Sequence, residues 1–127
     1  IITDNPWETD EDTLQSIALL SELPKPYVLT VFSLSLAPDT PLYTKAQRDG
    51  LIPEHTGNAY SQHFYDFDQS KPLNVILGLF REPEVFEEPL QRLLATYKEP
   101  PRFEAALANY RSRLKRVERP KSSAVVW

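Results

Sequence analysis

The stretch Ile2-Thr3-Asp4-Asn5-Pro6-Trp7-Glu8-Thr9 decides the fold that this sequence predicts. Its apolar start and polar continuation are typical of the end of a buried parallel strand, and Pro6 excludes a further ladder hydrogen bond because proline has no N–H. Thr9 predicts a helix N-cap, because Asp12 follows at capping-box spacing and acidic residues occupy the first turn. We therefore expect a strand, a tight loop and a helix in this order.

Residues 27–36 form the most strand-like segment of the chain. Their apolar residues leave neither face fully polar, which is the pattern of a strand buried on both faces of a parallel sheet. A strand, a helix and a second strand within about 35 residues have the size of a βαβ unit. Both strands would end at one edge of the sheet, in loops 4–8 and 33–40, and ligands of α/β folds bind at that edge.

A second helix is predicted directly after this strand. Thr40 is suited to its N-cap and Pro41 to its first position. Gly50 predicts a left-handed stop, with Leu51 and Ile52 folding back on the last turn. The sequence up to residue 52 therefore predicts an α/β domain, or part of one.

The remainder of the chain divides into an irregular stretch and a helical stretch. Residues 53–71 have no clear period and are rich in aromatic residues, and long loops of this kind are often functional. Residues 72–127 show three apolar stripes at helical spacing, separated by prolines. The stripes consist of Leu73, Ile76, Leu77 and Phe80; of Leu90, Leu93, Leu94 and Tyr97; and of Phe103, Ala106, Leu107, Tyr110, Leu114 and Val117.

Composition limits the classes of protein to which the chain can belong. Its 127 residues suffice for one domain, and its net charge of −4 gives no sign of a nucleic-acid partner. No apolar run is long enough to cross a membrane, and a cytoplasmic location is the default expectation. The absence of cysteine excludes a disulfide framework and thiolate-bound metal within this chain. Since the sequence also contains no methionine and begins inside the first predicted strand, we expect a piece of a longer protein.

Few residues suggest chemistry by themselves. Asp4 and Glu8 form either an acid–base pair or, as we favour, a loop-capping and a helix-start carboxylate. His55 and His63 are more consistent with solvated loop histidines than with a metal site. The aromatic residues 60–67 either line a substrate pocket or pad a surface, and the basic residues 111–121 are best explained as a solvated helix face. No catalytic residue and no metal ligand is assigned.

Two sequence blocks resemble one enzyme family. Asp4-Asn5-Pro6-Trp7-Glu8-Thr9 resembles the loop after the fifth barrel strand of radical S-adenosylmethionine enzymes, whose common form is I-x-G-x-P-G-E-T followed by acidic residues. Residues 32–43, ending in Pro38-Asp39-Thr40-Pro41-Leu42-Tyr43, resemble the sixth strand and its P-G-T-x-L-Y loop, with Gly50-Leu51-Ile52 in place of the usual G-L-I. The likeness is greatest to the branch with an N-terminal cobalamin-binding domain, which includes the oxygen-independent magnesium-protoporphyrin ester cyclase type and several methyltransferases.

The chain departs from the family pattern at three glycine positions. Asp4 and Trp7 stand where many relatives have glycine in the first loop, and Asp39 replaces the glycine of P-G-T. If that loop needs a positive φ, Asp39 must supply it, and Asp tolerates the left-handed region better than most residues do.

The resemblance implies a fold, a mechanism and a set of binding residues. The fold would be a partial TIM-type barrel of about two strands in residues 1–52, followed by the loop 53–71 and the helical extension 72–127. The parent enzyme, an oxidoreductase or methyltransferase acting on a small molecule, would use a [4Fe-4S] cluster to convert S-adenosylmethionine into a 5′-deoxyadenosyl radical, with cobalamin as a further cofactor in its branch. The resemblance assigns support of S-adenosylmethionine to Ile2, Asp4, Asn5, Glu8, Ser33, Leu34, Ser35 and Ala37.

The same resemblance gives these residues specific roles. Ile2 would support the adenine, Glu8 would fix the loop geometry, and backbone groups of residues 33–37 would line the adenine edge. The cluster cysteines would lie upstream of this sequence, so the chain alone would be inactive and would bind no cofactor. Its partner would be the missing part of its own barrel, and an isolated chain would self-associate or be marginally stable because half a barrel leaves strand edges unpaired. The alternative is a non-catalytic helical interaction module, which would fold as a closed monomer.

Overall fold

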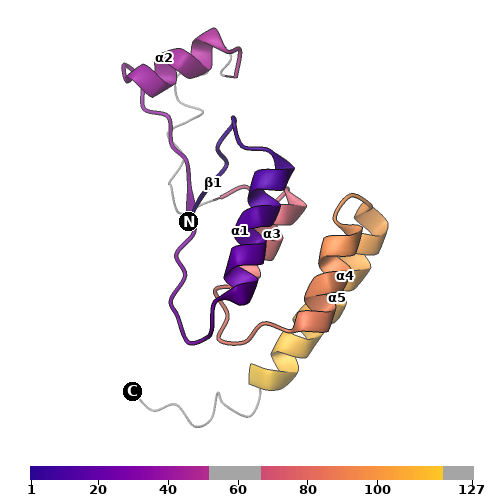
Figure 1. Ribbon diagram of the computed structural model, residues 1–127. Coiled ribbons are helices and arrows are strands. Elements are labelled where there is room, and N and C mark those ends of the chain that lie inside the picture. Colours follow the sequence, from indigo (N-terminus) through magenta and orange to yellow (C-terminus); the bar gives the residue numbers. More distant parts are fainter. Residues whose placement is uncertain (52–66, 119–127) are drawn as a thin grey trace. The chain divides into compact units, whose positions relative to one another are not determined.

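The computed structural model describes residues 1–51 and 67–118, which form two compact units, Ile1–Arg81 and Glu82–Trp127 (Figure 1). The elements are β1 (Ile2–Thr3), α1 (Asp10–Glu22), β2 (Phe32–Ser33), α2 (Pro41–Arg48), α3 (Pro72–Leu79), α4 (Glu87–Thr96) and α5 (Pro100–Glu118).

The sheet of the first unit consists, within the described residues, of β1 and β2 in parallel. Ile2 pairs with Phe32 and Thr3 with Ser33. The N–H of Phe32 donates to the carbonyl of Ile1, and the N–H of Leu34 donates to the carbonyl of Thr3, both at 2.8 Å. The predicted strand–helix–strand order is confirmed. At this coarse level the chain fits the predicted α/β class, as a mostly helical fold with a small parallel sheet.

The second strand is much shorter than the sequence predicts. Of residues 27–36, only Phe32 and Ser33 are in the ladder, and Val28 is 96% exposed although its apolar character suggested burial. Val31, by contrast, is buried. An apolar run becomes a long buried strand only where neighbouring strands and helices cover it. Within the described residues β2 pairs with β1 at two positions, so its ladder is two residues long.

Helix α1 begins as predicted. Thr9 is its N-cap in a capping box, since the Asp12 N–H donates to the Thr9 hydroxyl and the Thr9 N–H donates to the Asp12 carboxylate at 2.9 Å. Its buried residues are Ile17 and Leu20. In this unit α1 lies against α3 (Figure 1).

Helix α3 is the most buried helix segment of the first unit. The predicted stripe is confirmed, because Leu73, Ile76, Leu77 and Phe80 are all buried. The compact unit that contains the two strands thus also contains α3, which the sequence placed in a helical extension from residue 72. The predicted boundaries at residues 52 and 72 stay predictions.

Helix α2 also has the predicted ends. The Tyr43 N–H donates to the Thr40 side chain, and Pro41 occupies the first turn. At the other end Gly50 has a φ of 71°, the Leu51 N–H donates to Ala46 and the Gly50 N–H to Gln47. These two bonds are those of a Schellman motif, and Leu51 packs back against the cluster of Leu36 and Ala46.

The second unit is built on the helices α4 and α5, which lie side by side (Figure 1). Leu90, Leu93, Phe103 and Leu107 are buried, in agreement with the predicted stripes. Tyr110 is fully buried, and its ring lies 5.4 Å from that of Phe86.

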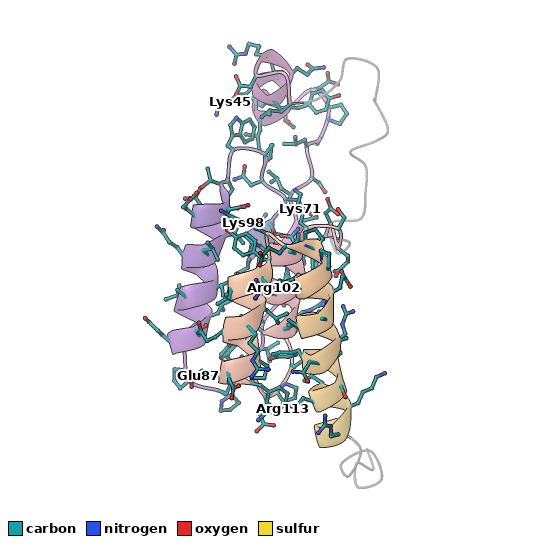
Figure 2. The ribbon with its side chains drawn as sticks, turned by 90° about the vertical axis from the view of Figure 1, so that its right-hand side faces the viewer. Lys45, Lys71, Glu87, Lys98, Arg102 and Arg113 are labelled. Carbon is teal, nitrogen blue, oxygen red and sulfur yellow. The ribbon has the colours of Figure 1, made fainter. Side chains whose placement is uncertain are left out.

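The Tyr110 hydroxyl caps the start of α4. It accepts a hydrogen bond from the Phe86 N–H at 3.2 Å, where Phe86 is the N-cap residue and has no side-chain oxygen of its own. Burial raises the pKa of Tyr110, and the Glu82 carboxylate adds to this, so the phenol is neutral at physiological pH. Arg113, labelled in Figure 2, places its guanidinium 4.6 Å from the Phe86 ring.

Replacing Tyr110 by Phe is expected to lower the free energy of unfolding by about 1–3 kcal/mol, because the buried Phe86 N–H loses its acceptor. Chemical denaturation would measure this. Tyr97→Phe, at the half-buried C-cap of α4, is the matched control and should change the free energy of unfolding by less than about 0.5 kcal/mol. Equal effects of the two substitutions would contradict the capping role.

Candidate functional site

The two strand-to-helix loops begin beside each other. Because Thr3 pairs with Ser33 in a parallel register, the residues that follow, Asp4 and Leu34, leave the sheet at the same edge. Asp4 has a φ of 61°, which turns the chain sharply at this point. The sequence-based prediction that both loops share one carboxyl edge is therefore confirmed.

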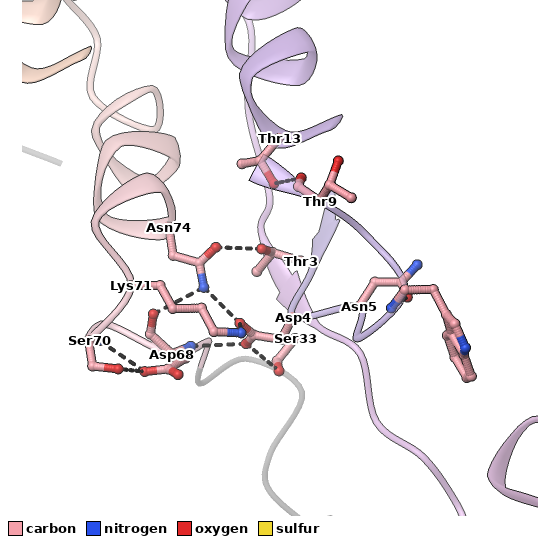
Figure 3. A network of polar contacts seen from close by, with 11 residues as sticks. Thr3, Asp4, Asn5, Thr9, Thr13, Ser33, Asp68, Ser70, Lys71 and Asn74 are labelled. Atoms are coloured by element: carbon pink, nitrogen blue, oxygen red, sulfur yellow. Dashed lines mark hydrogen bonds and ion pairs between the residues drawn. The ribbon is translucent and has the colours of Figure 1, made fainter. Parts of the chain in front are cut away.

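The Asp4 carboxylate is the centre of a polar network at this edge (Figure 3). One oxygen accepts from the Ser33 hydroxyl at 2.7 Å and from the Asp68 N–H at 2.9 Å. The other accepts from the Asn74 amide at 2.7 Å, and the Lys71 ammonium lies 3.5 Å from it. The Asp4 side chain is 13% exposed, so these donors replace most of its water.

Asn74 joins this carboxylate to β1 and to the turn before α3. Its side-chain nitrogen also donates to the Asp68 carbonyl at 3.0 Å, and its oxygen accepts from the Thr3 hydroxyl at 2.6 Å. Asp68 in turn accepts from the N–H and hydroxyl of Ser70. One network thus connects β1, β2, the turn 67–71 and α3.

Several of these residues were missed by sequence reasoning: Thr3, Asp68, Ser70, Lys71 and Asn74. Asn74 carries a signal that was available, since it is the one polar side chain in the apolar octapeptide Pro72–Leu79. A polar residue at a buried helix position needs a partner, and this alone indicates a contact across the fold. Nothing local identified Asp4 as that partner.

The pKa of Asp4 is lowered. Burial by itself would raise it, but the hydrogen bonds from Ser33, from the Asp68 backbone and from Asn74, together with the Lys71 charge, outweigh that cost. The carboxylate is therefore ionised at neutral pH and acts as a fixed acceptor. This environment favours the loop-capping interpretation of Asp4 over an acid–base role.

The pKa of Glu8 is shifted upward, in the opposite direction to that of Asp4. Partial burial raises its pKa, and the nearby Asp12 carboxylate adds to the effect. Its backbone N–H donates to the Asn5 carbonyl at 3.0 Å, which closes the turn of the first loop. Asn5 is exposed and its side chain accepts from the Trp7 N–H at 3.0 Å.

Trp7 ties the first loop to α2. Its indole N–H donates to the Asp49 carboxylate at 2.9 Å, and the Lys45 ammonium, labelled in Figure 2, lies 4.3 Å from its ring centroid. The ring packs against the Leu36–Ala46 cluster. The loops after β1 and β2 are therefore held together on both sides of the sheet edge, by the Asp4 network and by Trp7.

The remaining predicted binding residues lie along the same segments. Ile2 is 59% exposed on β1. Leu34 is half-buried and packs against the Leu36–Ala46 cluster. Ser35 and Ala37 are exposed, and the Ala37 carbonyl accepts from the Thr40 hydroxyl at 2.7 Å. The structure thus brings Asp4 and Ser33 into direct contact and distributes the others along the two strand ends.

Other predicted features fall partly outside the described residues. His55, His63 and the aromatic residues 60–65 lie outside them, whereas Phe67 is buried with the Arg81 guanidinium 5.1 Å from its ring. In the basic stretch 111–121, the side chains of Arg111, Arg113, Lys115 and Arg116 are exposed, as a solvated helix face requires.

Substituting Asp4 by Asn is expected to lower the free energy of unfolding at pH 7 by about 2 kcal/mol, because the network loses its charged acceptor. The folded-state pKa lies below the ordinary value of 3.8, so this stabilisation is present above pH 3.8 and disappears as the pH falls toward the folded pKa. The difference in the free energy of unfolding between wild type and Asp4→Asn should therefore become smaller as the pH of the denaturation experiment is lowered from 7 to 3.

Asp39→Asn is the matched control, since Asp39 has a similar φ of 66° and is exposed. It should change stability by less than about 0.5 kcal/mol at either pH. A pH-independent gap between Asp4→Asn and wild type would contradict the assigned role of the charge.

Within residues 1–51 and 67–118, no three His, Asp or Glu side chains gather as metal ligands. Among the same residues, no helix has both the length and the apolar character needed to cross a bilayer. Comparisons of the chain with protein-family models, with curated proteins and with solved structures found no match. The geometry of the sheet edge and the sequence motifs that form it are therefore the basis for a functional assignment.

Proposed function

We propose that this chain is the C-terminal portion of a radical S-adenosylmethionine enzyme, in which the two strand-end loops support the adenosyl group. One observation carries the proposal. Among the described residues, Asp4 and Asp39 are the non-glycine residues with positive φ, at 61° and 66°. They stand at two of the three positions at which I-x-G-x-P-G-E-T and P-G-T have glycine, the residue that adopts this conformation at least cost. Trp7, at the third position, does not have a positive φ.

The arrangement of the elements supports the same proposal. Two parallel strands joined by a helix are what a fifth and sixth barrel strand would look like in isolation, and the Schellman motif at Gly50 lies where the family has G-L-I. The exposed apolar side chains of Ile1, Ile2 and Val28 support the expectation that further strands and helices of a partial TIM-type barrel would cover this unit.

The residues of the sheet edge fit the adenosyl part of S-adenosylmethionine. Ile2 offers an exposed apolar side chain for the adenine, and the exposed residues Ser35 and Ala37, on either side of the buried Leu36, offer backbone groups. Asp4 stays ionised and orients Ser33, while Glu8 belongs to the turn that shapes the first loop. In this proposal the chain's residues bind and orient, and none of them is catalytic.

The chain does not fit the [4Fe-4S] cluster, because it contains no cysteine. Cluster and cobalamin would be held by residues outside this sequence, as would most of the small-molecule substrate. Such a cluster, in its reduced form, would supply the one electron that cleaves S-adenosylmethionine into methionine and a 5′-deoxyadenosyl radical.

A helical protein-interaction module is the second candidate. The observation that favours it is the separate compact unit formed by α4 and α5, whose exposed cations include Arg111, Lys115 and Arg116. Such a unit needs no neighbouring barrel strands. The two candidates differ in whether the same reading frame encodes a cysteine motif upstream.

The proposed glycine-like role of Asp39 predicts opposite effects of two small substitutions. Asp39→Gly should preserve or slightly raise stability, whereas Asp39→Ala should lower it by about 1 kcal/mol because alanine is strained at this φ. Thermal and chemical denaturation of the chain would measure both. Equal stability of the two variants would argue against a backbone-determined glycine position.

The proposed function itself is tested by reading the coding sequence upstream of Ile1 and expressing the longer product. We expect a C-x-x-x-C-x-x-C loop upstream and, after anaerobic reconstitution with iron and sulfide, formation of 5′-deoxyadenosine from S-adenosylmethionine under reducing conditions. Replacing the three cysteines by alanine should abolish the product. A start codon directly before Ile1, or an upstream sequence without that loop, would refute the proposal and leave the interaction module.

A further inference from the structure

Burying the polar Asn74 side chain in α3 costs free energy that its hydrogen bonds must offset. It is 4% exposed and sits in the first turns of an otherwise apolar helix, where leucine would bury more apolar surface. A buried amide is tolerated only when its hydrogen bonds are made, and the partners of the Asn74 side chain, at Thr3, Asp4 and Asp68, all lie outside α3. The contacts therefore serve the neighbouring segments rather than the helix.

The direction of each hydrogen bond in this network is determined by chemistry. The ionised Asp4 carboxylate only accepts, so the amide nitrogen of Asn74 must face it, and the amide oxygen must then face the Thr3 hydroxyl. The second Asp4 oxygen accepts from Ser33. Two successive hydrogen bonds thus lead from α3 to β2, at the residue where the second loop begins.

We infer that Asn74 is a positioning residue for the adenosyl group of S-adenosylmethionine. By orienting the Asp4 carboxylate, it holds Ser33 and the backbone that follows in the geometry the adenine would contact. The inference rests on the proposed function. It adds a residue of α3, outside both sequence blocks, that acts through Asp4 and touches no reacting atom.

Asn74→Asp is the sharpest single test, because it keeps the shape of the side chain and replaces the donor facing Asp4 by a second carboxylate. Lys71 and Asp68 are the other charged residues at this point of the network. In the reconstituted longer protein we expect the KM for S-adenosylmethionine to rise about tenfold, with kcat changed less than about twofold. The calorimetric affinity for S-adenosylmethionine should fall by the same factor.

The exchanged pair Asp4→Asn with Asn74→Asp is the rescue variant. The amide introduced at position 4 would donate to the carboxylate introduced at position 74, which still accepts from Thr3, while the amide oxygen at position 4 still accepts from Ser33. The bond to the Asp68 carbonyl is lost, so we expect recovery to within about threefold of the wild-type KM rather than full recovery. This variant also decides the question if Asn74→Asp does not fold.

Amide hydrogen exchange in the 127-residue chain provides a readout independent of activity. Asn74→Leu should accelerate exchange at Asp68, whose N–H binds Asp4, and also at Leu34, whose N–H binds the Thr3 carbonyl. The Leu90 N–H in the second unit should be unaffected and serves as the internal control. If Asn74 has a merely local structural role, the substitution would accelerate amide exchange at Asp68 but leave the exchange rate at Leu34 and the KM as in wild type.

The outcomes separate the two levels of the proposal. A longer wild-type protein that neither binds S-adenosylmethionine nor forms 5′-deoxyadenosine overturns the proposed function and this assignment with it. An active wild type whose Asn74→Asp variant has an unchanged KM, or a variant that the exchanged pair fails to rescue, overturns the role of Asn74 alone.

Discussion

The structure of the first unit depends on one ionised carboxylate placed at the end of a strand. Asp4 receives donors from β2, from the turn at Asp68 and from α3, segments that follow it by 29, 64 and 70 positions. A single acceptor with two oxygens is suited to this because each oxygen accepts more than one hydrogen bond. Without that carboxylate, the Asn74 side-chain nitrogen would keep its bond to the Asp68 carbonyl but lose its bond to Asp4, and the Asp68 N–H would lose its acceptor.

A second constraint acts on the opposite side of the same loop. The Trp7 indole contacts α2 and its C-terminal end in three ways. It donates to the Asp49 carboxylate, the Lys45 ammonium lies over its ring, and the ring packs against the cluster of Leu36 and Ala46. In the family that the loop resembles, this position is often glycine, so a side chain here replaces backbone freedom with packing. The loop is thereby held at one end by the Asp4 network and farther along by Trp7.

Local features of the helices were predictable because their causes are local. Thr9 with Asp12, Thr40 with Pro41, and Gly50 with Leu51 lie within a few residues of the bonds that they make. The apolar stripes of α4 and α5 were likewise predictable, since a period of 3.6 residues selects one buried face whatever covers it. In α3 the predicted stripe is buried, but Asn74, Val75 and Leu79 are buried as well, so this helix is covered on more than one face. Asp39 has a φ of 66°, the positive value that it would have to supply if the loop has the conformation of P-G-T; that expectation came from the family resemblance rather than from a local cause.

The length of β2 and the partners in the polar network depend on tertiary contacts rather than on local sequence. The ten-residue strand expected at 27–36 is a two-residue ladder, because β structure depends on partners that a sequence does not place. Among the described residues the sheet is the parallel pair of β1 and β2, and the predicted TIM-type barrel is not shown.

From its sequence alone, this chain determined the start of α1, both ends of α2, apolar residues that the later helices bury, and that two loops follow two parallel strands. Only the tertiary structure decided that Asp4 would meet Ser33, Asp68, Lys71 and Asn74. The physical reason is distance along the chain. Caps and stripes arise from interactions within one or two helical turns, whereas the partner of a buried amide is chosen by the packing of segments 70 positions apart.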